Sequence, residues 1–314
     1  SLTSLILACG SSGQESAPAP APFETSEIFQ KMEIGELPSD WQFLSVVFTK
    51  YLSVFGVNVF ASEDTPDSKI IHVSNVLAHY LDNNADGAPD NPLVLSTMTD
   101  VNASIFMVAS EDDRDRLWDR LPERFHEMAD SGELRVQDLD GEETNPDESE
   151  NRFDASLEEV LHLITQVGYA EAYPNVFGEK AGSKIAGYMD VARGGHFEER
   201  RESDCDDDRP TSKWKQGQCA LPPNGEYPNQ AWYTYDDPTC DYRCMITEYF
   251  YWALTSILGA QKDYDRCTGI AVEWTLCNLE QVKIGDPNIY ELLIDPTYML
   301  PTILPDGTYP PIPR

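Results

Sequence analysis

Positively charged residues are scarce in this chain of 314 amino acids. Lys and Arg number 22 against 55 Asp and Glu, which gives a formal net charge of −33 at pH 7. A charge of this sign and size repels nucleic acid phosphates and anionic lipid headgroups, so it argues against both as partners. We therefore expect a secreted protein in a saline or calcium-rich medium, with no nucleic acid partner.

Several common functional signatures are also missing. The sequence contains no P-loop, no dinucleotide-binding glycine pattern and no Ser nucleophile elbow. After the first nine residues, no segment approaches the length of a membrane-spanning helix. No motif therefore indicates a nucleotide-binding enzyme, a serine hydrolase or a membrane-spanning protein.

The first nine residues resemble the end of a bacterial lipoprotein signal peptide. An apolar run, Leu5-Ile6-Leu7, leads through Ala8 to Cys9. This pattern predicts lipidation of Cys9, which would place the protein in a bacterial cell envelope, facing the periplasm or the exterior. The membrane would then be reached only through this lipid anchor. Residues 10–22, rich in Ala, Pro and Ser, would form a tether, and residues 23–314 a single domain.

The remaining cysteines are confined to the last third of the chain. They are Cys205, Cys219, Cys240, Cys244, Cys267 and Cys277. An even number of cysteines in an exported protein predicts three disulfides, whose pairing the sequence leaves open. The alternative is a thiolate metal site that uses Cys240 and Cys244. Residues 202–277 are thus expected to form a disulfide-rich loop region.

A loop rich in acids and amides follows a predicted helix at residues 69–81. The positions that supply oxygen ligands in an EF-hand-type calcium loop are occupied by Asp82, Asn84, Asp86, Ala88 (through its backbone carbonyl) and Asp90. Gly87 takes the position of the sharp turn, but Leu93 stands where a bidentate Glu is usual. The pattern predicts a structural Ca²⁺ site like those of extracellular modules. A polar turn without an ion is the alternative.

Hydrophobic patterning predicts an α+β fold. Apolar and β-branched runs indicate strands at 50–61 (one strand or a pair), 103–109 and 133–139, and helical periodicity indicates helices at 69–81 and 112–130, one beginning near residue 155, and one at 244–254.

The helix beginning near residue 155 carries the most informative motif. Its apolar residues recur at the spacing that buries one side of a helix, which leaves Glu158 and His162 one turn apart on a neighbouring stripe. Glu159 lies between them. In the metallopeptidase motif H-E-x-x-H, two His at this spacing bind one metal and the intervening Glu acts on the bound water. Here Glu replaces the first His.

A third metal ligand is expected from the later helix at 244–254. Glu248 is the one acid in an otherwise apolar and aromatic stretch, where a carboxylate is costly unless it is paired or ligated. An ion pair or a capping contact is the alternative explanation. Tyr242 lies shortly before it.

Together these motifs resemble the zincin metallopeptidases of the gluzincin type, most of all the catalytic domain of anthrax toxin lethal factor and its relatives. The resemblance implies a mixed sheet packed on a metal-site helix. It implies Zn²⁺ or another divalent transition metal bound by Glu158, His162 and Glu248, with Glu159 as general base and Tyr242 stabilising the oxyanion. The implied function is surface-anchored hydrolysis of a peptide or protein substrate.

Two other interpretations remain. The Glu in place of His adds negative charge beside the metal, so the chain could be an inactive zincin scaffold that serves as a calcium-loaded binding module. Alternatively, Glu159 and His162 match the E-x-x-H ligand pair of di-iron helix bundles, but that site needs a second such helix and the chain has one motif. His196, in a predicted loop, is expected on the surface.

Overall fold

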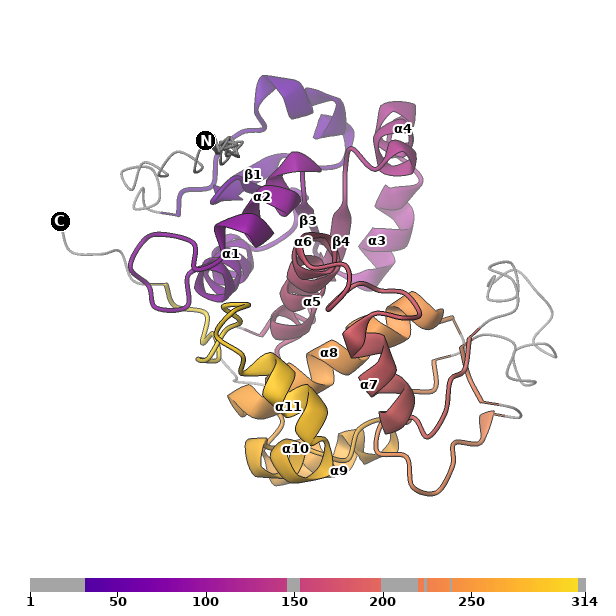
Figure 1. The fold of residues 1–314 in the computed structure, drawn as a ribbon. Helices are drawn as coiled ribbons and strands as arrows, with labels where there is room; N and C mark the ends of the chain where they lie inside the picture. The colour runs from indigo at the N-terminus through magenta and orange to yellow at the C-terminus, as the bar shows by residue number, and fades with distance from the viewer. Residues whose placement is uncertain (1–31, 146–152, 199–219, 223–224, 238, 310–314) are drawn as a thin grey trace, which may run out of the picture.

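A four-stranded mixed sheet with helices on both faces forms the first half of the molecule (Figure 1). The computed structural model describes residues 32–145, 153–198, 220–222, 225–237 and 239–309. The predicted α+β class is confirmed. Cys9 and the tether at 10–22 lie outside the described residues, so their predicted roles stay predictions.

The strands follow one another across the sheet in chain order. They are β1 (Lys50–Val54), β2 (Val57–Ala61), β3 (Ser104–Val108) and β4 (Val136–Asp140). The first two pair antiparallel, and the other pairings are parallel. Phe55 and Gly56 join the hairpin with φ angles of 52° and 89°. Two positive φ angles fit a type I′ turn, whose twist matches that of the strands.

Both faces of the central strands are buried. Alternate residues of β2 and β3, such as Val59 and Ile105, belong to one apolar cluster together with residues of α1 (Asp67–Leu81) and α5 (Ser156–Leu163). Phe60 and Phe106 point to the other face and pack with a second cluster, which η1, α3 and α4 help to cover. The ranges of these three helices are η1 (Ser39–Val46), α3 (Glu111–Trp118) and α4 (Glu123–Ser131).

The second half of the molecule is helical and surrounds one long helix, α8 (Tyr242–Leu258) (Figure 1). Most of α8 is buried, with Asp241 capping its start and Gly259 ending it at a φ of 90°. It contacts α5 and several shorter helices. The other helices of this half are α7 (Lys184–Ala192), α9 (Tyr264–Gly269), η6 (Ile270–Val272), α10 (Leu279–Gly285) and α11 (Pro287–Leu293).

The single helix predicted at 112–130 is wrong. Two helices, α3 and α4, occupy this segment, and the chain between them contains Pro122. Proline lacks a backbone N–H and its ring clashes with the preceding turn, so a helix cannot run through it without breaking. The other predicted elements are present with shifted ends. The two strands at 50–61 form a pair, for example, and α8 is longer than the predicted helix at both ends.

Two disulfides tie the helical half together. Cys240 is bonded to Cys244 at the start of α8, and Cys267 to Cys277. The alternative of a thiolate metal site at Cys240 and Cys244 is therefore wrong, because a disulfide sulfur carries no thiolate charge. Cys205, Cys219 and most of the loop from residue 202 lie outside the described residues. Across the described part of the chain, helices of sufficient length and apolarity to cross a membrane are absent.

Close packing distorts the chain after α5. The helix continues as a wider π-helical segment, η2 (Ile164–Tyr169), and ends in α6 (Ala170–Ala172). Gly168 of η2 packs against α2 (Pro92–Asp100), where an added Cβ would lie 2.6 Å from the side chain of Val94. Glycine is therefore required for this helix contact, which holds η2 close to α2.

The segment 298–309, named here the C-terminal strap, crosses the loop between α1 and α2. Asn83 in this loop makes the central contacts. Its Oδ1 accepts hydrogen bonds from the backbone N–H groups of Thr302 and Ile303, both at 2.8 Å. Its Nδ2 donates to the carbonyls of Ile303 (2.8 Å) and His79 (3.0 Å). The loop and the strap, more than 200 residues apart in sequence, thus share one buried amide.

Replacing Asn83 with alanine is expected to lower the free energy of unfolding by about 2–3 kcal/mol, because several buried backbone groups lose their partner at once. Chemical unfolding monitored by circular dichroism measures the change. Asn288→Ala, at an exposed position of α11, is the control and should change little. Equal effects of the two substitutions would show that the strap contact does not contribute to stability.

Candidate functional site

The α5 helix presents its polar stripe beside a buried apolar one, as its sequence predicts. Val160 and Leu161 are fully buried in the core. The start of the helix is held by Asp154, whose Oδ1 accepts from the backbone N–H of Ser156 (3.2 Å) and whose Oδ2 accepts from the Ser156 hydroxyl (2.7 Å). Asp154 also contacts Nε2 of His72 in α1 at 2.6 Å. These contacts fix the helix that carries the predicted site.

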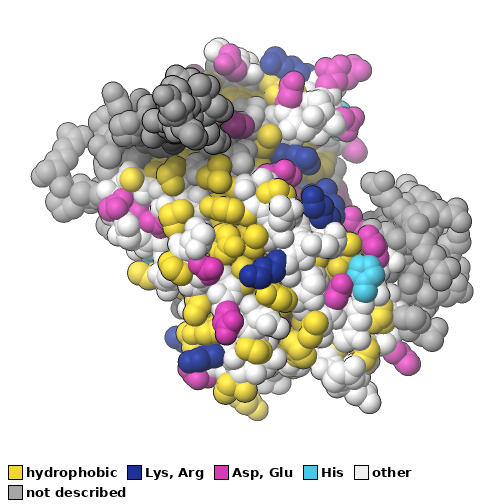
Figure 2. Space-filling view, in the orientation of Figure 1, with side chains coloured by type: hydrophobic (Ala, Val, Ile, Leu, Met, Phe, Trp, Pro, Cys, Tyr) yellow, Lys and Arg dark blue, Asp and Glu magenta, His cyan; other side chains and the backbone are white. Residues whose placement is uncertain are grey.

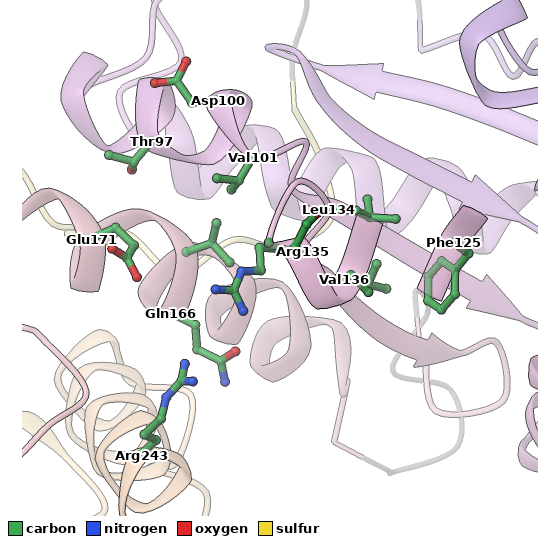
Figure 3. A pocket seen from close by; sticks show the side chains of 14 residues that line it. Thr97, Asp100, Val101, Phe125, Leu134, Arg135, Val136, Gln166, Glu171 and Arg243 are labelled. Carbon is green, nitrogen blue, oxygen red and sulfur yellow. The ribbon is translucent and has the colours of Figure 1, made fainter. Parts of the chain in front are cut away.

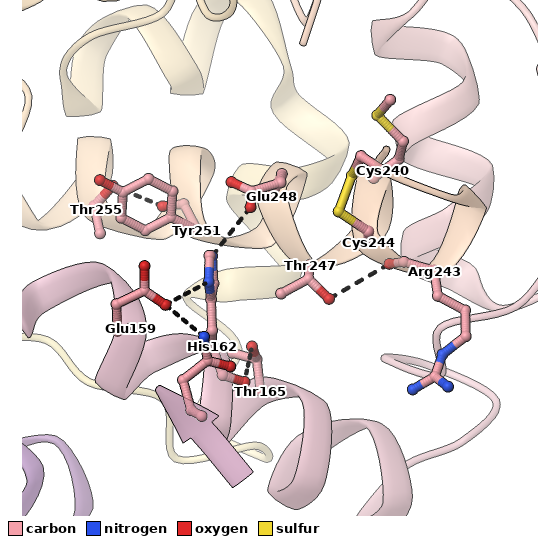
Figure 4. A network of polar contacts seen from close by, with 12 residues as sticks. Glu159, His162, Thr165, Cys240, Arg243, Cys244, Thr247, Glu248, Tyr251 and Thr255 are labelled. Atoms are coloured by element: carbon pink, nitrogen blue, oxygen red, sulfur yellow. Dashed lines mark hydrogen bonds and ion pairs between the residues drawn. A yellow bond between two sulfur atoms is a disulfide. The ribbon is translucent and has the colours of Figure 1, made fainter. Parts of the chain in front are cut away.

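The structure brings four predicted residues together where α5 meets α8, and Figure 4 labels three of them, Glu159, His162 and Glu248. Glu158, Glu159 and His162 each offer a ligand atom within 4.8 Å of the others. On the opposite side of the imidazole ring, Nε2 of His162 lies 3.6 Å from Oε1 of Glu248. The sequence motif on α5 and the isolated acid on α8 therefore belong to one group.

The two ring nitrogens of His162 have different surroundings. Nδ1 lies 3.7 Å from Oε2 of Glu159. Nε2 is buried and has no hydrogen-bond partner, and the same holds for Oε2 of Glu248. His162 is only 6% exposed and Glu248 only 7%. Buried polar atoms are nearly always hydrogen-bonded, so these two unsatisfied atoms, beside the 3.6 Å approach of Nε2 to Oε1 of Glu248, call for a further partner in this group.

Mutual electrostatics shift the pKa values of these groups. Burial alone would lower the pKa of His162, but the attraction of Glu248 and the contact with Glu159 outweigh it and raise this pKa to about 10. Burial raises the pKa of Glu248 to about 8, against the opposing attraction of His162. Burial raises the pKa of Glu158 as well. The group thus holds more carboxylates than one imidazolium can neutralise, in a place where ionised carboxylates are unfavourable.

Three side chains that the sequence analysis did not select support this group. Gln137 of β4 donates to Oε2 of Glu159 at 2.5 Å. The ring of Tyr251 packs edge-on against His162, with 5.5 Å between ring centroids, and its hydroxyl hydrogen-bonds to Glu158. Arg266 donates to the same hydroxyl at 3.3 Å. The spacing of Tyr251, three residues after Glu248 on α8, was a usable signal, since such residues share a helix face.

The structure does not bring Tyr242 to this group. Its hydroxyl donates to Oδ1 of Asp190 at 3.0 Å, and its ring packs against His196. The predicted surface position of His196 agrees with the structure, where it contacts Asp190 (2.8 Å) and Glu198 (3.1 Å). An oxyanion role for Tyr242 therefore finds no support in its position.

The predicted calcium loop connects α1 to α2 and folds around its own acids. The buried carboxylate of Asp82 accepts from the backbone N–H groups of Asp86 (3.1 Å) and Gly87 (2.7 Å), and from the hydroxyl of Tyr309. Asp90 accepts from the N–H of Asn83 at 2.6 Å. The acids of this loop are not gathered as tightly as the group on α5. Asn84 and Ala88 lie in the same loop, and the Ca²⁺ site stays a prediction.

Compared with protein-family models, with curated proteins and with solved structures, the chain matches none.

Proposed function

We propose that this chain is a metal-dependent hydrolase of peptides, with Glu158, His162 and Glu248 as the ligands of one divalent transition metal. The observation that carries the proposal is the pair of buried atoms without hydrogen bonds, Nε2 of His162 and Oε2 of Glu248. An imidazole and a carboxylate that face each other from two helices are typical zinc ligands.

The distance between the facing atoms supports a shared ion. Two ligands that each lie about 2.0–2.1 Å from one tetrahedral zinc are roughly 3.4 Å apart. His162 and Glu248 approach to 3.6 Å, which is too long for a good hydrogen bond and suits two ligands of one ion.

The arrangement around His162 also matches that of metal-bound histidines. Such a residue usually donates its second ring N–H to a carboxylate, which fixes the tautomer and leaves the other nitrogen free for the metal. Oε2 of Glu159 approaches Nδ1 to 3.7 Å, close to the position of such an acceptor, and Nε2 is the nitrogen on the side of Glu248. A divalent cation would neutralise the excess negative charge of the buried group.

The order of elements supports a zincin-like arrangement. The polar stripe of α5 borders the mixed sheet at β4, and α8 adds the third ligand from the helical half. A bound divalent metal would supply Lewis-acid chemistry, polarising a scissile carbonyl and acidifying a water. Gln137 and His162 both contact Oε2 of Glu159, which leaves Oε1 to take up a proton as general base.

Two further parts of the proposal concern the setting of the site. We propose that the loop 82–90 binds a structural Ca²⁺, for which its oxygen-rich positions are suited. We also propose an anchored location in a bacterial cell envelope, through lipidation of Cys9. The two disulfides support an oxidising compartment.

The test is the metal content of the natively purified protein, measured by elemental mass spectrometry, in the wild type and in the variants His162→Ala and Asp86→Ala. We expect about one equivalent of a transition metal per chain. It should be lost in His162→Ala and kept in Asp86→Ala, whereas calcium should be lost in Asp86→Ala alone.

The two variants serve as controls for each other, since each leaves the other site intact. A wild-type protein that carries calcium and no transition metal would overturn the hydrolase proposal and favour a calcium-loaded binding module. A transition metal that remains in His162→Ala would place the metal elsewhere. A positive result is followed by a peptidase screen with the metal-loaded protein.

A further inference from the structure

A cavity of about 640 Å³ lies between the edge strand β4 and the helices around it (Figure 3). Its volume falls in the range of small-molecule and peptide side-chain sites. Val101, Phe125 and Val167 contribute apolar parts of its wall. Its polar lining includes two arginines, Arg135 and Arg243, in a chain where Lys and Arg total 22 of 314 residues.

The cavity borders chain segments that adjoin the proposed metal ligands, since η2 continues α5 and Arg243 lies on α8. Arg135 precedes β4 and lies two residues from Gln137, so the two side chains share a face of the extended chain about 7 Å apart. Gln166 follows His162 by about one helical turn, and Arg243 precedes Glu248 by about 7.5 Å along the axis of α8. None of the residues that line the cavity belongs to the Glu159–His162 group, so the cavity is connected to that group through these chain segments.

Three nitrogen-bearing side chains converge inside the cavity. In Figure 3 the guanidinium groups of Arg135 and Arg243 and the amide of Gln166 point toward one another. Arg243 donates to Glu179 at 2.8 Å. Within the described ranges, the side chains of Arg135 and Gln166 have no hydrogen-bond or ion-pair partner, so their donors are available to a ligand.

The charged side chains that line the cavity indicate which chemical class of ligand it would bind. Guanidinium groups bind carboxylates through two parallel hydrogen bonds, and an amide N–H₂ adds a further donor. Asp100 and Glu171 also line the cavity (Figure 3), and Glu171 lies close enough to Arg243 to interact with its charge, so these acids would repel a second negative group. On the face shown in Figure 2, Lys and Arg side chains are few and scattered, so a cavity with two of them is an exception on an acidic protein.

We propose that this cavity binds a carboxylate of the peptide substrate through Arg135, Gln166 and Arg243. The inference names the substrate class of the proposed metal site and rests on the proposed function in that respect. The carboxylate belongs to an Asp or Glu side chain or to the free end of the peptide, since both offer the same planar group.

The experiment compares three labelled peptides of one sequence by fluorescence anisotropy. One contains an internal Glu and has blocked ends, one has Gln in its place and a free C-terminal carboxylate, and one has Gln and blocked ends. The protein is the full chain, measured as purified and after chelation. Charge-assisted hydrogen bonds are expected to make a carboxylate peptide bind roughly 10-fold more tightly than the neutral one.

The variants Arg135→Gln and Arg243→Gln should lose this preference, and Arg116→Gln, an exposed arginine of α3, should keep it. Because the net charge of −33 opposes any acidic peptide, general electrostatics predict the reverse order of affinities. Tighter binding of the peptide with the internal Glu, or of the peptide with the free C-terminus, supports the proposal. It also shows whether the bound carboxylate belongs to a side chain or to the end of the peptide. Equal binding of all three peptides, or equal effects of Arg135→Gln and Arg116→Gln, would overturn it.

The binding readout separates this inference from the proposed function. A protein that discriminates between the peptides but holds no transition metal would overturn the hydrolase proposal alone. A metal-loaded protein without discrimination would overturn the carboxylate site alone.

Discussion

Replacing Glu159 with glutamine is expected to lower peptide hydrolysis by a factor of about 10²–10⁴ while the metal stays bound. Glutamine keeps the shape of the side chain but cannot accept a proton at neutral pH. The proposed ligands Glu158, His162 and Glu248 are unchanged by this substitution. Oε2 of Glu159 approaches Nδ1 of His162, whereas Oε1 of Glu248 approaches Nε2, so the substitution removes no atom of the proposed ligands.

The measurement combines kcat/KM on a cleaved peptide with elemental analysis of the same preparation. Glu127→Gln, on the exposed surface of α4, provides the matched control and should retain the wild-type rate. Loss of the metal from Glu159→Gln would make Glu159 a ligand, and an unchanged rate would remove it from the chemistry.

Replacing Glu248 with glutamine is expected to have opposite effects with and without metal. With metal at about 1,000 times its dissociation constant, the wild type gains roughly 4 kcal/mol of stability by binding. The variant should lose most of this gain, because an amide is a poor ligand. In the presence of a chelator, the variant should be at least as stable as the wild type, since it no longer buries a carboxylate whose pKa is raised to about 8.

This reversal in the order of stabilities, with metal and with chelator, shows whether Glu248 is a metal ligand or a partner in a structural ion pair. If Glu248 only pairs with His162, breaking that buried pair should cost about 3–5 kcal/mol whether or not metal is present. Thermal unfolding of both proteins, with added metal and with chelator, gives the four values required. Glu280→Gln on α10 controls for the loss of an exposed charge.

Local patterns predicted much of the fold, and tertiary contacts explain what they missed. The spacing of apolar residues predicted the strands and the helices α1, α5 and α8, because each of these elements buries apolar residues at the regular spacing of a strand or a helix. Leu117 and Leu121 continue a helical spacing of apolar residues past the end of α3, whereas Pro122 prevents one helix from spanning the segment. The shared amide of Asn83 joins segments about 220 residues apart, and no local pattern carries such a contact.

The candidate site was found where its residues are close in sequence. Glu158, Glu159 and His162 share one helix, and Glu248 was conspicuous as the single acid in an apolar helix. Tyr242 precedes Glu248 by six residues, which turns its side chain about 120° around the helix axis and directs it to Asp190. Gln137 comes from the edge strand of the sheet, so its contact with Glu159 of α5 depends on packing that sequence spacing does not encode.

The strap has a consequence for the order in which the chain folds. A protein emerges from the ribosome from its N-terminus, and domains begin to form before synthesis ends. The loop between α1 and α2 is made early, but Asn83 finds its partners at Thr302 and Ile303 only after some 220 further residues have been added. The hydrogen bonds between Asn83 and the strap can therefore form only after the chain has been synthesised past Ile303.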